Sequence, residues 1–177
     1  MASSPIISDR PPPWELPDTQ LLAECRFEAF VGPGPGGQKR HKTNAAVRFT
    51  HLPTRIHAMA TDSRSQRENK IHALRELRHK LAMEVRRDVD PLTFRPPEWF
   101  AQYAGLHINP KNPLYPSAVA TVLDVLKAMR WGVSESAVML GVTTSALTRF
   151  LFDDPALWTK ANDVRARLGM KTLTRRK

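Results

Sequence analysis

The residue types best suited to chemistry stand together in a glycine- and proline-rich stretch, GPGPGGQ at residues 32–38. Gly36 and Gly37 have no Cβ, so the backbone there can adopt positive φ and approach a crowded site closely. Gln38 adds a backbone N–H, an amide donor and an amide acceptor, none of which titrates near neutral pH. The residues that follow are basic: Lys39, Arg40, His41 and Lys42. This order predicts a neutral amide that a cationic loop delivers to nucleic acid, although a Gly-Gly-Gln tripeptide alone also fits an ordinary surface loop.

Two phosphate-binding motifs with similar glycine spacing are excluded. A dinucleotide-binding loop needs backbone N–H groups aimed at the pyrophosphate, and Pro33 and Pro35 have none. A P-loop needs a lysine and then a serine or threonine, where this chain has Gln38 and Lys39. The single cysteine, Cys25, has no evident histidine partner in the sequence, and the histidines share no ligand spacing with cysteine or carboxylate pairs. We therefore expect neither a metal nor a cofactor.

Most of the net charge of +10 follows this loop directly. Residues 39–87 contain 13 basic and 4 acidic side chains. Such a field attracts polyanions, nucleic acid above all, although a solvated basic face has the same composition. No apolar run reaches the roughly 18 residues that a membrane helix needs, and the N-terminus has no signal-peptide core. We expect a cytoplasmic, monomeric protein that faces nucleic acid and no membrane.

Strands and one long helix are predicted to position the loop. Alternating and aromatic residues indicate three strands, at residues 25–31, 46–52 and 56–60. Ser65 and Glu68 form a capping box at the start of a helix. The apolar stripe expected on this helix consists of Ile71, Leu74, Leu77, Leu81 and Val85. The stripe would pack on a small antiparallel sheet, so the fold class predicted for residues 21–87 is α+β.

Prolines divide the rest of the chain. Residues 1–20 contain five and are expected to be a flexible tail, and residues 88–116 contain six and are expected to be a linker whose aromatics rest on a domain. Residues 117–177 are predicted to be all-α, with a short basic tail. Within them SAVMLGVTTSALTRFL resembles helix-turn-helix sequences, in which the second helix would expose Thr144, Ser145, Thr148 and Arg149. Packing or protein contact is the alternative role for this segment.

Two longer stretches, GPGGQKRHKTNAAVRFTHLPT and TDSRSQRENKIHALRELRHKLA, resemble the catalytic domain of class I peptide chain release factors. The resemblance covers residues 23–87. The motifs that carry it are Gly36-Gly37-Gln38, Lys42-Thr43, the Thr50 to Thr54 turn, Arg64-Ser65-Gln66 and Asn69-Lys70.

The resemblance implies hydrolysis of the peptidyl-tRNA ester in the ribosomal peptidyl transferase centre. Gln38 would be the catalytic residue, and Gly36 and Gly37 would permit its backbone geometry. The partners implied are ribosomal RNA, peptidyl-tRNA and a methyltransferase that modifies Gln38. The residues predicted to contact nucleic acid are Lys39, Arg40, His41, Lys42, Arg48, Arg64, Arg67, Lys70, Arg149, Lys171, Arg175, Arg176 and Lys177.

The chain departs from the family pattern in two respects. Arg40 and His41 replace the usual small hydrophobic residue and asparagine after Gly-Gly-Gln-x. About 35 residues precede Gly36, too few for a codon-reading domain. The chain therefore resembles the short codon-independent rescue factors that act on stalled ribosomes. Two alternatives stay open: a non-catalytic RNA- or DNA-binding protein, and a hydrolase that a partner recruits through the C-terminal helices.

Overall fold

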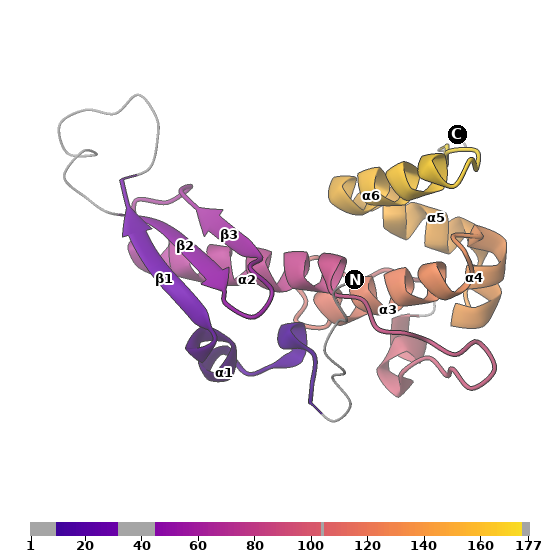
Figure 1. Cartoon of the computed structure of the whole chain (residues 1–177), viewed down its shortest axis with the longest axis horizontal. Coiled ribbons are helices and arrows are strands. Elements are labelled where there is room, and N and C mark those ends of the chain that lie inside the picture. Colours follow the sequence, from indigo (N-terminus) through magenta and orange to yellow (C-terminus); the bar gives the residue numbers. More distant parts are fainter. Residues whose placement is uncertain (1–9, 32–44, 104, 175–177) are drawn as a thin grey trace. The chain divides into compact units, whose positions relative to one another are not determined.

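A computed structural model describes residues 10–31, 45–103 and 105–174. The chain forms two compact units, unit 1 (Met1–Glu84) and unit 2 (Val85–Lys177) (Figure 1). The boundary lies three residues before the end of the α+β domain predicted from the sequence. The stretch expected to be a linker, residues 88–116, falls within unit 2.

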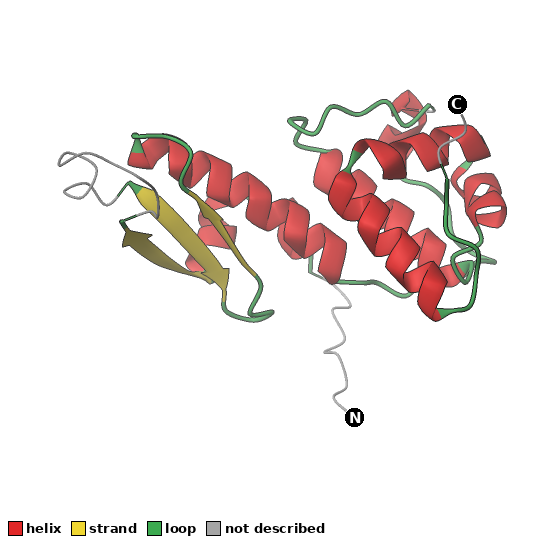
Figure 2. Cartoon of the chain, turned by 90° about the horizontal axis from the view of Figure 1, so that it is seen from above, coloured by secondary structure: helices red, strands yellow, loops and turns green. Residues whose placement is uncertain are grey.

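Unit 1 contains a three-stranded antiparallel sheet in the order β1 (Cys25–Phe30), β2 (Ala46–His51), β3 (His57–Ala60). Helix α2 (Gln66–Glu84) packs along one face of this sheet (Figure 2). Val47, Phe49 and His51 alternate along β2 and are buried, as expected for side chains that point to a covered face. The predicted α+β fold is therefore confirmed.

The start of α2 has one half of the predicted capping box, because the Ser65 backbone N–H donates to the Ser63 hydroxyl and not to Glu68. The Ser65 hydroxyl accepts a hydrogen bond from the Glu68 backbone N–H at 3.3 Å. The buried side of the helix contains Asn69, Ala73, Leu77 and Leu81, each four residues apart. Ile71 is 51% exposed, so the prediction that it belongs to the buried stripe is wrong. Because Ile71 comes two residues after Asn69, its side chain lies about 200° round the helix axis from the side that meets the sheet.

Part of the expected N-terminal tail is a packed segment. It contains a 3-10 turn, η1 (Pro13–Glu15), and helix α1 (Asp18–Ala23). Trp14 and Leu16 are buried, and Arg78 of α2 donates hydrogen bonds to both of their carbonyl oxygens, at 2.8 and 2.7 Å. Two large apolar side chains and the partly buried guanidinium of Arg78 thus hold this proline-rich stretch against α2.

Unit 2 is helical and is built around α3 (Tyr115–Ala128), whose residues from Tyr115 to Leu126 are all buried. The other helices are η3 (Glu98–Tyr103), α4 (Val133–Leu140), α5 (Thr144–Asp153) and α6 (Pro155–Arg167). Phe100, Leu106 and Ile108 are also buried, so the proline-rich stretch contributes to the core of this unit. No helix in the described part of the chain is long and apolar enough to cross a membrane.

Helices α4 and α5 are joined as in a helix-turn-helix. Gly141 ends α4 at a φ of +68°, which favours glycine, and the Thr143 hydroxyl caps α5 by accepting from the Ala146 N–H. Ala137, Leu140, Leu147 and Leu151 are buried, as that motif requires.

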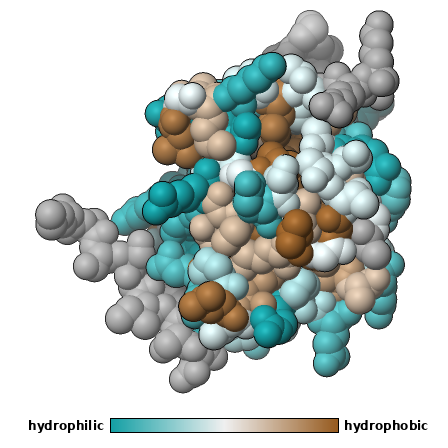
Figure 3. Space-filling model, turned by 90° about the vertical axis from the view of Figure 1, so that its right-hand side faces the viewer, coloured by the Kyte–Doolittle hydropathy of each residue, from teal (hydrophilic) through white to brown (hydrophobic). Residues whose placement is uncertain are grey.

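On the face shown in Figure 3, apolar side chains form separate patches among polar ones.

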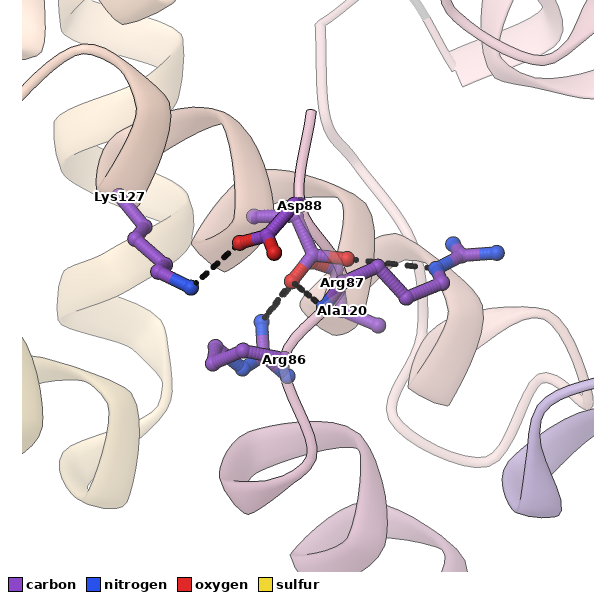
Figure 4. A network of polar contacts seen from close by, with 6 residues as sticks. Arg86, Arg87, Asp88, Ala120 and Lys127 are labelled. Carbon is purple, nitrogen blue, oxygen red and sulfur yellow. Dashed lines mark hydrogen bonds and ion pairs between the residues drawn. The ribbon is translucent and has the colours of Figure 1, made fainter. Parts of the chain in front are cut away.

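A buried carboxylate in α3 organises the beginning of unit 2 (Figure 4). Asp124 is 1% exposed, and its Oδ1 accepts hydrogen bonds from Arg86 Nη1 at 2.8 Å and from the Arg87 backbone N–H at 3.1 Å. Arg86 Nη1 also donates to the Ala120 carbonyl oxygen. Burial raises the pKa of Asp124, and the two arginines oppose that rise. Lys127 and Asp88 make a second, exposed ion pair beside it.

Candidate functional site

The Gly-Gly-Gln segment, residues 32–44, connects two neighbouring strands. Phe30, the last residue of β1, pairs with Ala46, the first residue of β2. The predicted catalytic residues Gly36, Gly37 and Gln38 lie outside the described residues, and so do Lys39, Arg40, His41 and Lys42. The structure therefore describes the sheet from which this segment departs and to which it returns.

Asn69 of α2 binds the backbone at Ala45, where the segment rejoins the sheet. Its side-chain Nδ2 donates to the Ala45 carbonyl oxygen at 2.7 Å and to the Ser63 carbonyl oxygen at 2.8 Å. Its Oδ1 accepts from the Ser63 backbone N–H at 3.0 Å. The side chain is fully buried and both of its polar atoms are bonded. The sequence singled out Asn69 only as part of a family motif, and gave no role for it.

The predicted nucleic-acid contacts in unit 1 lie on two faces of the sheet. Arg64 and Arg67 are exposed at the start of α2. Lys70, one turn further along, places its ammonium 4.7 Å from the centre of the Phe27 ring. Arg48 lies on the face of β2 that points away from α2. Its guanidinium lies 5.4 Å from the centre of the Phe30 ring. The structure therefore does not bring Arg48 together with the three residues at α2.

A second polar network lies at the other end of β2 and was not predicted from the sequence. His51 is 1% exposed, with Nε2 3.1 Å from Oε2 of Glu24 and Nδ1 2.8 Å from Oγ1 of Thr54. Arg10 also binds Glu24. Burial alone would raise the pKa of Glu24, but hydrogen bonds from Arg10 and His51 outweigh it and hold that pKa below its usual value.

Other chemical groups of the described residues do not suggest a protein nucleophile or a metal centre. Burial, together with the charge of Glu24, raises the pKa of Cys25 to about 11, so its thiol is protonated at neutral pH. No group of three or more His, Cys, Asp or Glu side chains in the described part of the chain could hold a metal ion.

The predicted contacts in unit 2 are peripheral to its core. Arg149 is exposed on α5 and donates through Nη2 to the Gly105 carbonyl oxygen at 2.8 Å. Lys171 is exposed, and its carbonyl oxygen accepts hydrogen bonds from the Arg165 guanidinium at 2.8 and 3.0 Å. Arg175, Arg176 and Lys177 lie outside the described residues.

Comparison with known proteins identifies unit 1. Residues 20–91 match the RF-1 domain. Peptide chain release factor 2 of Nocardia farcinica is 36% identical over 101 residues, which are 54% of this chain and 26% of that protein. Peptide chain release factor 1 of Leptothrix cholodnii is 46% identical over 66 residues, 37% of this chain and 18% of that protein. That of Lawsonia intracellularis is 47% identical over 58 residues, 33% of this chain and 16% of that protein.

These matches cover between about a sixth and a quarter of the length of each release factor. The RF-1 domain match, residues 20–91, includes the sheet and the long helix described above and leaves the helical unit largely unmatched. Residues 20–91 are therefore similar to the RF-1 domain, and the chain is similar over part of its length to peptide chain release factors 1 and 2.

Proposed function

We propose that this protein hydrolyses the ester bond of peptidyl-tRNA in the ribosome, with Gln38 as its catalytic residue. The observation that carries the proposal is the position of Gly36-Gly37-Gln38 between two paired strands of an RF-1 domain. Peptide chain release factors 1 and 2 are among the proteins to which the chain is similar.

In the proposed reaction, the oxygen of a water molecule attacks the ester carbonyl carbon. The bond from that carbon to the ribose oxygen of the tRNA breaks, and a proton from the water ends on the ribose oxygen. The backbone N–H of Gln38 stabilises the charge that develops on the ester or the leaving oxygen, and one such oriented donor is worth roughly 10²–10³ in rate. The amide side chain admits water and excludes other nucleophiles, and ribosomal RNA supplies the rest of the site.

Basic side chains supply the affinity for the ribosome in this proposal. Arg64 and Arg67 project from the start of α2, where they can neutralise phosphates, and Lys70 and Arg48 extend the charge to the neighbouring strands. The basic residues 39–42 would act next to Gln38, and Lys171, Arg175, Arg176 and Lys177 would act at the C-terminus.

We further propose that hydrolysis does not depend on a stop codon, as in ribosome rescue. Beside its RF-1 domain the chain has a helical unit, and α5 of that unit presents Thr144, Ser145, Thr148 and Arg149 in the position of a recognition helix. This unit, rather than a codon reader, would select stalled ribosomes. The protein would act as a cytoplasmic monomer, and a methyltransferase would modify Gln38.

Peptide release from ribosomes that hold peptidyl-tRNA, with and without a stop codon in the decoding site, tests both parts of the proposal. We expect equal release in the two cases and a loss of at least about 100-fold for Gln38→Pro, which removes the backbone N–H, with ribosome binding nearly unchanged. Gly37→Ala should be comparably harmful. Release only at stop codons would contradict codon independence.

The alternative is a non-catalytic protein that uses the RF-1 domain to bind RNA or DNA. It predicts ribosome binding without release by the wild-type protein. Release that survives Gln38→Pro at the wild-type rate would show instead that the catalytic residue is a different one.

A further inference from the structure

We propose that Asn69 is a positioning residue for the hydrolytic reaction, because it fixes the backbone at which the Gly-Gly-Gln segment rejoins the sheet. This inference rests on the proposed function of Gln38. Asn69 touches none of the reacting groups in this proposal and acts through the main chain at Ala45.

The anchor joins three parts of unit 1. Asn69 lies in the first turn of α2, Ser63 lies in the loop before that helix, and Ala45 immediately precedes β2. The asparagine is fully buried, donates to the carbonyl oxygens of Ala45 and Ser63, and accepts from the Ser63 N–H. An apolar residue would fill the volume, but only an amide can both donate twice and accept at this position.

The loop before α2 is itself held rigidly. The Ser63 hydroxyl accepts from the Ser65 backbone N–H at 3.0 Å and donates to the Glu68 carboxylate. The Ser65 hydroxyl in turn accepts from the Glu68 N–H. The capped helix start therefore gives Asn69 a fixed base from which to hold Ala45.

The consequence follows from chain connectivity. Ala45 stands seven residues after Gln38, and the strand pair Phe30–Ala46 fixes the two ends of the connection relative to each other. Without the amide donors, the Ala45 carbonyl oxygen keeps its place in the sheet only through the neighbouring strand residues. A displacement of about 1 Å at a reacting group can cost roughly 100-fold in rate, so loss of the anchor should reduce the chemical step.

The test compares Asn69→Asp and Asn69→Ser with the wild-type full-length protein in the peptide-release assay. The first variant keeps the shape and the acceptor but removes both donors, and the second has too short a side chain to span both carbonyl oxygens. We expect the saturating release rate to fall about 10- to 100-fold. The half-saturating concentration should change less than about threefold, because the binding surface is intact.

His51→Phe is the matched control. His51 is as deeply buried, has two hydrogen-bond partners and lies at the opposite end of β2 from Ala46, about 17 Å away for a strand of this length. All variants are assayed well below their midpoints of thermal unfolding. The control should keep the wild-type saturating rate, since a general loss of stability does not move Gln38.

A double-mutant comparison separates the two proposals. With Gln38→Pro in the background, Asn69→Asp should cause no further loss, because the backbone N–H that would be positioned is gone. If Gln38→Pro itself releases peptide normally, the proposed function fails whatever Asn69 does. If Gln38→Pro is inactive while folded Asn69→Asp keeps the wild-type rate, or His51→Phe loses as much, only the positioning role is wrong. If neither Asn69 variant folds, Asn69 serves folding and the positioning role is wrong as well.

Discussion

Glu24 is the charged residue on which the polar network at His51 depends. Its carboxylate accepts from His51 and binds Arg10, and these hydrogen bonds hold its pKa below the usual value of 4.5 although burial opposes them. A carboxyl whose pKa is lowered by folding stabilises the folded state above its unfolded pKa. That stabilisation is lost as the pH falls through the folded pKa.

We therefore predict that Glu24→Gln lowers the free energy of unfolding at pH 7 by about 1 kcal/mol, a modest value because the carboxylate is partly exposed. The difference from the wild type should shrink as the pH falls below 4.5, where the unfolded carboxyl takes up a proton, and should be lost once the pH passes the lower folded pKa. Urea unfolding at pH 7, 5 and 3.5 measures it. A difference that stays constant over this range would show that the network stabilises through shape alone.

Buried polar residues were the part of unit 1 that the sequence could not predict. Periodicity identifies side chains that face a core, and Leu77 and Leu81 were assigned correctly. It treats every polar residue as exposed, so it missed His51 and Asn69, whose partners Glu24 and Ala45 stand 27 and 24 residues away in the chain. The same rule placed Ile71 in the buried stripe, where the fully buried Asn69 and Ala73 in fact mark the covered side.

At the scale of elements, α3 carries a carboxylate, Asp124, that is buried and paired with Arg86. Removing Asp124 would leave the Arg86 guanidinium and the Arg87 N–H with one acceptor fewer in the interior of unit 2. We predict that Asp124→Ala lowers the free energy of unfolding by about 3 kcal/mol. Asp124→Asn should lose less, because an amide oxygen of the same shape can still accept. Chemical unfolding followed by circular dichroism measures both.

Lys127→Ala supplies the contrast on the same helix. Its partner Asp88 is 96% exposed, so this ion pair is screened by solvent and its loss should leave the unfolding midpoint unchanged. An equal loss for Lys127→Ala and Asp124→Ala would show that burial does not decide the strength of these contacts.

The elements themselves were predictable where one periodicity dominates. Alternation along β2 and the capping box at α2 gave the strand and helix positions to within a residue or so. The N-terminal segment was not predictable in this way. Its prolines indicate irregular structure, but the burial of Trp14 and the bonds from Arg78 depend on a helix more than sixty residues further along.

At the scale of the whole molecule, the motif residues indicated the family of unit 1 and little about unit 2. Gly-Gly-Gln and its companion motifs are local in the sequence, and they stand within residues 20–91, which match the RF-1 domain. A proline-rich stretch, by contrast, predicts a linker whether or not the stretch is folded. Only the burial of Phe100, Leu106 and Ile108 shows that this stretch belongs to the helical unit.

The division into two units leads to a prediction about how ribosomes are selected. If α5 contacts ribosomal RNA, its exposed side chains should contribute to binding and not to chemistry. We predict that Thr144→Ala, Ser145→Ala and Arg149→Ala, combined in the full-length protein, raise the half-saturating concentration for release by about tenfold. The saturating rate should stay within about threefold of the wild-type rate. An interaction shared by the ground and transition states changes only the half-saturating concentration.

Arg167→Ala is the control for charge, because Arg167 is exposed near the end of α6 and carries the same charge as Arg149. It should leave the half-saturating concentration unchanged. Loss of a phosphate contact at Arg149 should also reduce the salt dependence of ribosome binding by about one unit of slope. Weaker binding with an unchanged salt dependence would indicate that α5 binds a protein. A lower saturating rate at unchanged affinity would mean that unit 2 acts on the position of Gln38 instead.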